Sequence, residues 1–161
     1  MRRKALIIRI NYQKAYQKNI CKVQKILLDT DVILDFFYDR DTFSEDIAKL
    51  LSMCESNRIS GCITPVICSN VYYILRQTAP HAKDIDKLKQ LLMILSVLPM
   101  DGEVVVQALN SGFRDFEDAL QNAAATSEKD IAIIVTRNVK DYRNSELSIM
   151  TPEEYLKQLG Q

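Results

Sequence analysis

Carboxylates recur in this sequence beside apolar runs, at spacings that allow them to act together. Asp29 directly follows one such run, Asp115 and Asp118 open a segment of helical periodicity, and Asp141 comes shortly after a later apolar run. Four acids brought into one crevice repel one another and raise each other's pKa unless a cation neutralises them. With no His or Cys suitably placed, oxygen ligands favour Mg²⁺ or Mn²⁺. Such a site performs phosphoryl transfer or phosphodiester hydrolysis, and nucleic acid is the natural substrate.

The elements that must position these acids alternate along the chain. Short apolar runs are followed by longer segments of helical period, a pattern typical of a parallel sheet covered by helices on both faces. The predicted strands are residues 25–28, 58–63, 95–99, 131–135 and 147–150. A first helix follows Asp29, and further helices are predicted over residues 44–56, 64–75, 83–94, 103–110, 115–124 and 151–159.

Two of the predicted helix starts bear directly on the site. Thr64 before Pro65 fits an N-cap and a first helical residue, and the helix that follows is apolar nearly all round, so we expect it to be largely buried. Asp115 suits two roles equally well, as an N-cap or as a site carboxylate. Its i, i+3 spacing from Asp118 places both acids on one helical face.

Parallel strands all end at one edge of their sheet, and the helix that follows each strand begins there. Asp29 leaves the first strand at this edge, and Asn70 lies about a turn and a half into the helix after the second. The helix that carries Asp118 begins at the same edge, and residues 136–141 emerge there after the fourth strand. We therefore expect these polar residues to share one crevice.

Composition indicates an ordinary globular protein in a reducing compartment. The 161 residues are 47% hydrophobic and 26% charged, which fits one domain with one core. The four cysteines show no C-x-x-C spacing, and three of them sit in apolar runs. We expect a cytoplasmic protein without structural zinc.

The charge balance is uneven along the chain. Eight of the 21 basic residues and none of the 21 acids lie before residue 26, so the rest of the chain holds 13 bases against 21 acids. The apolar run 5–10 is far shorter than the ~20 residues that a membrane span needs. We interpret residues 1–24 as a basic, poorly ordered extension and residues 25–161 as the folded domain, with no membrane association.

Five stretches together resemble the PIN-domain family. They are Ile26-Leu27-Leu28-Asp29-Thr30-Asp31-Val32, the helix from Thr64-Pro65 to Arg76, Asp115-Phe116-Glu117-Asp118-Ala119-Leu120, Ile134-Val135-Thr136-Arg137-Asn138-Val139-Lys140-Asp141-Tyr142, and Thr151-Pro152-Glu153-Glu154-Tyr155-Leu156. The resemblance implies a three-layer α/β/α sandwich on a parallel sheet of about five strands. It also implies a ribonuclease specific for single-stranded RNA and dependent on Mg²⁺ or Mn²⁺. Many bacterial members are VapC-type toxins, usually dimeric, that a small antitoxin protein neutralises.

The resemblance also assigns roles to residues of this chain. Asp29 matches the family's first metal carboxylate, and Asp118 matches the one that precedes the Ala-Leu pair. Either Asn138 or Asp141 fills the last acidic position, with Thr136 holding a water or a ligand.

The chain departs from the family pattern at one position. Asn70 stands where the family usually has a glutamate, and an amide oxygen brings no charge to a hard cation. We expect weaker metal affinity unless Asp115 supplies the missing charge.

Several of the candidate site residues also fit purely structural roles. Asn70 also fits a hydrogen-bonded polar group in the core. Asp35 is expected to be a cap or a solvent-facing acid, whereas Asp31 is placed to contact the metal shell through water. Arg137, together with Lys140 and Arg143, either positions phosphates or forms a solvated rim.

Four ring-bearing side chains are expected away from the chemistry. We expect His81 in a loop without a catalytic part. We expect Tyr72, Tyr73 and Phe113 in the core or in an interface.

Two other functions compete with the nuclease. A haloacid-dehalogenase-type phosphatase also places Asp-x-Asp after a strand, but Ile33 stands where that family needs Thr or Ser. A PIN-like module that binds RNA or a partner protein without much catalysis fits the Asn70 substitution and the acidic body.

Overall fold

A computed structural model of the chain describes residues 23–41, 43–78 and 80–160. The predicted basic extension 1–24 lies outside the described residues except for its last two positions. Within the part that is described, no helix is long and apolar enough to cross a lipid bilayer.

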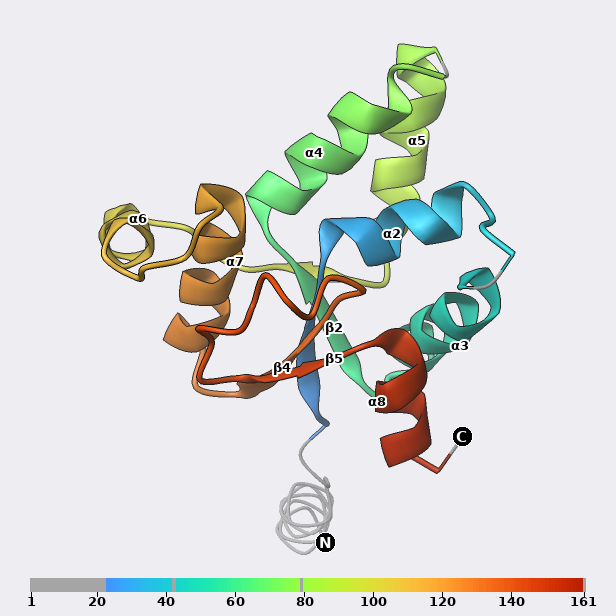
Figure 1. The fold of residues 1–161 in the computed structure, drawn as a ribbon. Coiled ribbons are helices and arrows are strands. Elements are labelled where there is room, and N and C mark those ends of the chain that lie inside the picture. The colour runs from blue at the N-terminus through green and yellow to red at the C-terminus, as the bar shows by residue number, and fades with distance from the viewer. Residues whose placement is uncertain (1–22, 42, 79, 161) are drawn as a thin grey trace, which may run out of the picture.

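A five-stranded sheet forms the centre of the molecule (Figure 1). Its strands lie in the order β3-β2-β1-β4-β5, and every neighbouring pair is parallel. The strands are β1 (Lys25–Leu28), β2 (Ser60–Ile63), β3 (Ser96–Val97), β4 (Ile131–Val135) and β5 (Ser148–Met150). The parallel sheet predicted from the alternating pattern is therefore confirmed, with β1 at its centre.

Helices complete the alternation between strands. They are α2 (Thr30–Phe37), α3 (Ser44–Glu55), α4 (Pro65–Leu75), α5 (His81–Leu91), α6 (Gly102–Leu109), α7 (Phe116–Ser127) and α8 (Pro152–Gln158). Figure 1 shows α6 and α7 on one side of the sheet and α2, α3 and α8 on the other, with α4 and α5 beyond the ends of the strands. This is the predicted α/β/α sandwich.

The core follows from the sequence of the strands. β1 and β4 are covered on both faces, so they consist almost wholly of buried aliphatic residues, as parallel strands require. Gly61 in β2 allows the covering layer to approach closely, because a Cβ atom there would lie 2.7 Å from Cys54 Sγ of α3.

Several predicted caps are present in the structure. Thr64 Oγ1 accepts the Ile67 N–H at 3.1 Å, with Pro65 as the first residue of α4. Thr151 and Glu154 form a reciprocal capping box at the start of α8. These local hydrogen bonds fix where the helices begin, and therefore which residues stand at the edge of the sheet.

Helix α4 is less buried than its composition suggests. Only Ile67, Val71 and Leu75 are fully buried, whereas Tyr73 is 70% exposed. The prediction of a largely buried helix was wrong, because α4 lies beyond the strand ends and packs against α2 and α5 rather than inside a layer.

His81 also differs from its prediction. It is the first residue of α5 rather than part of a loop, and its Nδ1 lies 2.7 Å from the hydroxyl of Tyr72. The contact between Tyr72 and His81 therefore links α4 to α5.

Candidate active site

Asp29 is the residue around which the site is built. It follows β1 and is the N-cap of α2, and its Oδ1 accepts the Thr30 N–H at 2.6 Å. The backbone N–H of Asp29 donates to Val135 O of β4, which holds it at the carboxyl edge of the sheet. Its side chain is 6% exposed, so burial raises the pKa of this carboxyl.

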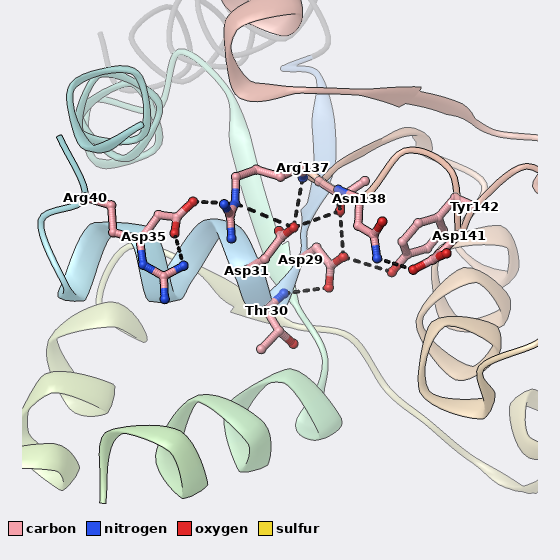
Figure 2. A network of polar contacts seen from close by, with 10 residues as sticks. Asp29, Thr30, Asp31, Asp35, Arg40, Arg137, Asn138, Asp141 and Tyr142 are labelled. Carbon is pink, nitrogen blue, oxygen red and sulfur yellow. Dashed lines mark hydrogen bonds and ion pairs between the residues drawn. The ribbon is translucent and has the colours of Figure 1, made fainter. Parts of the chain in front are cut away.

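Two hydroxyl groups support the second oxygen of Asp29, and Figure 2 shows that of Tyr142. Thr136 Oγ1 donates to Asp29 Oδ2 at 2.8 Å, and Tyr142 Oη lies 3.2 Å from the same oxygen and 2.8 Å from Gln121 Oε1. Burial and the neighbouring carboxylates raise the pKa of Tyr142, so its hydroxyl keeps its proton. These contacts orient Asp29 and stabilise its ionised form, which burial alone would disfavour.

Asp31 lies two residues further on, in the first turn of α2, and is held differently. Its Oδ2 accepts the backbone N–H of Arg137 at 3.0 Å, and Arg137 Nε lies 3.8 Å away. Burial, with the charge of Asp29 adding to it, raises the pKa of Asp31 to about 6, although Arg137 opposes the shift. Its Oδ1 is buried and has no hydrogen-bond partner among the described residues.

Asp35 does not face solvent, and that prediction was wrong. Its side chain is 0% exposed, with Oδ2 2.5 Å from Arg137 Nε and Oδ1 accepting from Arg40 Nη1 at 2.7 Å (Figure 2). Helix α2 points this face toward the loop that follows β4, and a charge buried there needs ionic partners. Arg137 is further packed against Phe43, with its guanidinium carbon 4.9 Å from the ring centre.

The start of α7 brings three more acids to the same edge. Asp115 is the N-cap, and its Oδ1 accepts the N–H groups of Glu117 at 2.8 Å and Asp118 at 3.3 Å. Burial raises the pKa of Asp118 to about 7, and the charges of Asp29, Asp115, Asp141 and Glu117 all add to the shift. Asp118 thus stands in a field made almost entirely of other carboxylates.

These acids line one hollow at the edge of the sheet. It has a volume of about 280 Å³, and its walls come from the start of α2, the start of α7 and the loop after β4. The lining residues are Asp29, Thr30, Asp31, Leu34, Asp115, Glu117, Asp118, Asn138 and Asp141. The topological argument from the sequence is therefore confirmed in bringing together the starts of α2 and α7 and the loop after β4.

Glu117 is a site residue that the sequence reasoning missed. Its side chain lines the hollow, and its Oε1 accepts a hydrogen bond from Asn70 Nδ2. Burial, together with the charges of Asp115 and Asp29, raises the pKa of Glu117. Its position one residue before Asp118, within the first turn of α7, was the available signal.

The loop after β4 contributes Asn138 and Asp141. Asn138 Nδ2 donates to Asp141 Oδ2, and the Asn138 backbone N–H donates to Thr136 Oγ1 at 3.0 Å. Both side chains line the hollow.

Three further residues expected in the crevice, Thr136, Arg137 and Asn70, which we also predicted to position substrate, lie behind its lining residues. Thr136 is fully buried beneath Asp29, Arg137 is engaged with Asp31 and Asp35, and Asn70 is engaged with Glu117. None of the three lines the hollow.

The donor set of the hollow fits a hard divalent cation in its chemistry. It offers carboxylate oxygens whose mutual repulsion a bound cation would relieve. Asp31 Oδ1 is buried without a hydrogen-bond partner, and a cation would also stabilise its charge. Among the described residues, however, no three His, Cys, Asp or Glu side chains already stand in a metal-holding arrangement. The charge pattern, rather than a formed coordination shell, is what indicates a cation.

Comparison with known proteins gives a family and a fold. A family model described as the PIN domain matches residues 25–140. The comparison with curated proteins gave no match.

Among solved structures, a chain of DNA-bound VapBC from Salmonella typhimurium is 16% identical with a TM-score of 0.65, covering 81% of this chain and 99% of that one. A chain of VapBC-1 from nontypeable Haemophilus influenzae is 17% identical with a TM-score of 0.62, covering 80% and 98%. VapC20 of Mycobacterium tuberculosis, described as a toxin that cleaves the sarcin-ricin loop, is 16% identical with a TM-score of 0.55, covering 68% and 86%.

Proposed function

The chain belongs to the PIN domain family, and we propose that it is a cytoplasmic endoribonuclease that cleaves single-stranded RNA with Mg²⁺ or Mn²⁺. The observation that carries this proposal is the shared hollow, where Asp29 from the end of β1 meets Asp115, Glu117 and Asp118 from the start of α7 and Asp141 from the loop after β4. PIN domains are generally nucleases that depend on divalent metal ions, and the charge pattern of the hollow agrees with that chemistry.

Within this proposal, Asp29 and Asp118 hold the cation, with Asp115 as a further carboxylate of the site. When bound, the ion polarises the phosphodiester, helps activate water and stabilises the leaving oxygen. Asn138 and Asp141 face the hollow from the other wall and orient the attacking water by hydrogen bonding.

The residues beneath the hollow have a supporting role in this proposal. Thr136 and Tyr142 fix the orientation of Asp29, and Asn70 fixes that of Glu117. Partners of this kind typically change metal affinity or activity by ~10 to 100-fold when removed.

We further propose that the protein is a homodimeric toxin that a small antitoxin protein neutralises. The likeness to chains of VapBC and VapC structures supports this at the level of the fold. Expression of the chain alone should arrest growth of a bacterial host, and co-expression of a small protein encoded beside it should restore growth. Unimpaired growth at high expression of the folded chain argues against a toxin.

Cleavage is tested with the purified protein and a labelled single-stranded RNA. Cleavage in Mg²⁺ or Mn²⁺ that stops in EDTA and in Asp29→Ala or Asp118→Ala supports the nuclease. The matched control is Asp86→Ala, which removes an exposed carboxylate of α5 that pairs with Lys89. Binding without cleavage would favour a binding module, and hydrolysis of a small phosphomonoester instead would favour a phosphatase.

A further inference from the structure

A second hollow adjoins the acidic one and carries the opposite charge. It has a volume of about 270 Å³ and is lined by Arg114, Asp115, Lys140, Asp141, Arg143 and Asn144. Asp115 and Asp141 also line the acidic hollow, so the two hollows share a wall. We call this second hollow the basic pocket.

The three cations of the basic pocket form no ion pairs within the described part of the chain. Arg114, Lys140 and Arg143 are exposed and make no ion pair with any described residue, whereas Lys25, Arg40 and Arg137 are all paired. The two carboxylates of the shared wall have other partners, because Asp115 caps α7 and Asp141 accepts from Asn138. The pocket therefore has three positive charges against two negative ones.

The walls of the pocket are tied together. Asn144 Nδ2 donates to Gly112 O at 3.0 Å, and the rings of Phe113 and Tyr142 pack edge to face with centres 6.1 Å apart. The loop after β4 is thus fastened to the segment that leads into α7, and a pocket between fastened walls is pre-organised for a ligand.

We infer that the basic pocket binds a backbone phosphate of single-stranded nucleic acid, next to the phosphodiester that is cut. Arginine and lysine side chains without internal partners suit phosphate oxygens, and two arginines offer planar forks for bidentate contact. Because the pocket shares a wall with the acidic hollow, one strand can reach both. This inference deepens the proposed nuclease function and rests on it for the place of the cut.

The test is the salt dependence of RNA binding, measured by fluorescence anisotropy in EDTA so that no cleavage is needed. The slope of log K against log salt is negative, and each lost phosphate contact reduces its magnitude by about 0.7 for single strands. Because the pocket holds one phosphate, we expect a loss of about 0.7 for the triple variant and no larger loss for Arg114→Ala, Lys140→Ala or Arg143→Ala alone. The controls are Arg58→Ala and Lys129→Ala, exposed charges before β2 and β4 at the opposite edge of the sheet, which should leave the slope unchanged.

A neutral methylphosphonate places the contact along the strand. Substituted at one linkage beside the cut, it should weaken binding to the parent protein but not to the triple variant.

If the triple variant keeps the parental slope, the inference is wrong, even where the parent cleaves RNA. If the triple variant binds RNA normally but no longer binds polyglutamate, the pocket recognises an acidic polypeptide instead, and the inference is overturned. If the parent and the variants show the expected slopes but the parent cleaves no RNA, the nuclease proposal is wrong and the phosphate site is still supported.

Discussion

Two sets of acids meet at the edge of this sheet, and the protein treats their charges in opposite ways. The inner carboxylates, Asp29, Asp31 and Asp35, are buried or nearly so and are held by Thr136, Tyr142, Arg137 and Arg40. The outer carboxylates, Asp115, Glu117, Asp118 and Asp141, have no basic side chain in an ion pair with them among the described residues.

The difference follows from burial. A carboxylate out of water needs hydrogen bonds or a cationic partner, because an unpaired buried charge is too costly to keep. A half-exposed carboxylate can remain beside others of its kind, at the cost of a raised pKa, as Asp118 shows. We therefore expect the inner carboxylates to matter first for folding and the outer ones for cation binding.

The largest effect on stability is expected where the inner network is broken. Arg137→Met removes the cation that contacts both Asp31 and Asp35, and leaving a buried charge without its partner typically costs about 3 to 5 kcal/mol. Arg40 still pairs with Asp35, so we expect a loss of about 3 kcal/mol in the free energy of unfolding, measured with urea.

The control for this loss is an exposed ion pair. Lys157→Met breaks the pair with Glu153 on the surface of α8 and should leave the free energy of unfolding nearly unchanged, because solvent screens an exposed pair. Equal losses in the two variants would contradict the division into inner and outer carboxylates.

The next effect concerns the contact that orients Glu117. Asn70→Ala should lower the cleavage rate by about 10 to 100-fold and raise the Mg²⁺ concentration for half-maximal rate, as removal of a supporting partner usually does. Tyr73→Ala, on the exposed face of the same helix, should change neither quantity.

Asn70→Glu tests whether residue 70 acts by orienting Glu117 or by contributing a ligand to the cation. Glutamate at this position would stand beside Glu117, and it should increase Mg²⁺ affinity only if this position itself can act as a ligand. If the Asn70→Glu variant shows no gain in Mg²⁺ affinity, the role of Asn70 is to orient Glu117 and not to bind the ion.

A smaller and opposite effect is expected for the outer carboxylates. Asp118→Asn removes one charge from a group of like charges, so the melting temperature in EDTA should rise slightly while the gain on adding Mg²⁺ becomes smaller. Asp86→Asn, on an exposed face of α5, should leave both values unchanged. A lower melting temperature in EDTA for Asp118→Asn would show that this carboxylate stabilises the fold.

The smallest effect is a dependence on pH. The pKa values of Asp31, about 6, and Asp118, about 7, lie above the ordinary 3.8, so the folded state binds these protons more tightly than the unfolded chain does. Their contribution to stability is complete below pH 3.8 and is lost as the pH rises to about 7. The increase in melting temperature on adding Mg²⁺ should therefore be larger at pH 8 than at pH 5. An equal increase at both values would place the cation away from these groups.

Much of the fold followed from local patterns. The strand β4 was predicted with the bounds it has, and the starts of α4, α7 and α8 were predicted from Thr64, Asp115 and Thr151. By contrast, β3 is only Ser96–Val97 although 95–99 was predicted, because an edge strand pairs on one side and ends where its neighbour ends.

The sequence by itself determined which segments supply the site, because parallel topology and helix caps place Asp29, Asp115 and Asp118 at one edge whatever their side chains contact. Only the tertiary structure decided how each charge is held. Asn70 reaches Glu117 across 47 residues, and Thr136 reaches Asp29 across 107. Contacts between such distant residues depend on how whole layers pack and on which rotamers fit between them, and no local periodicity records that choice.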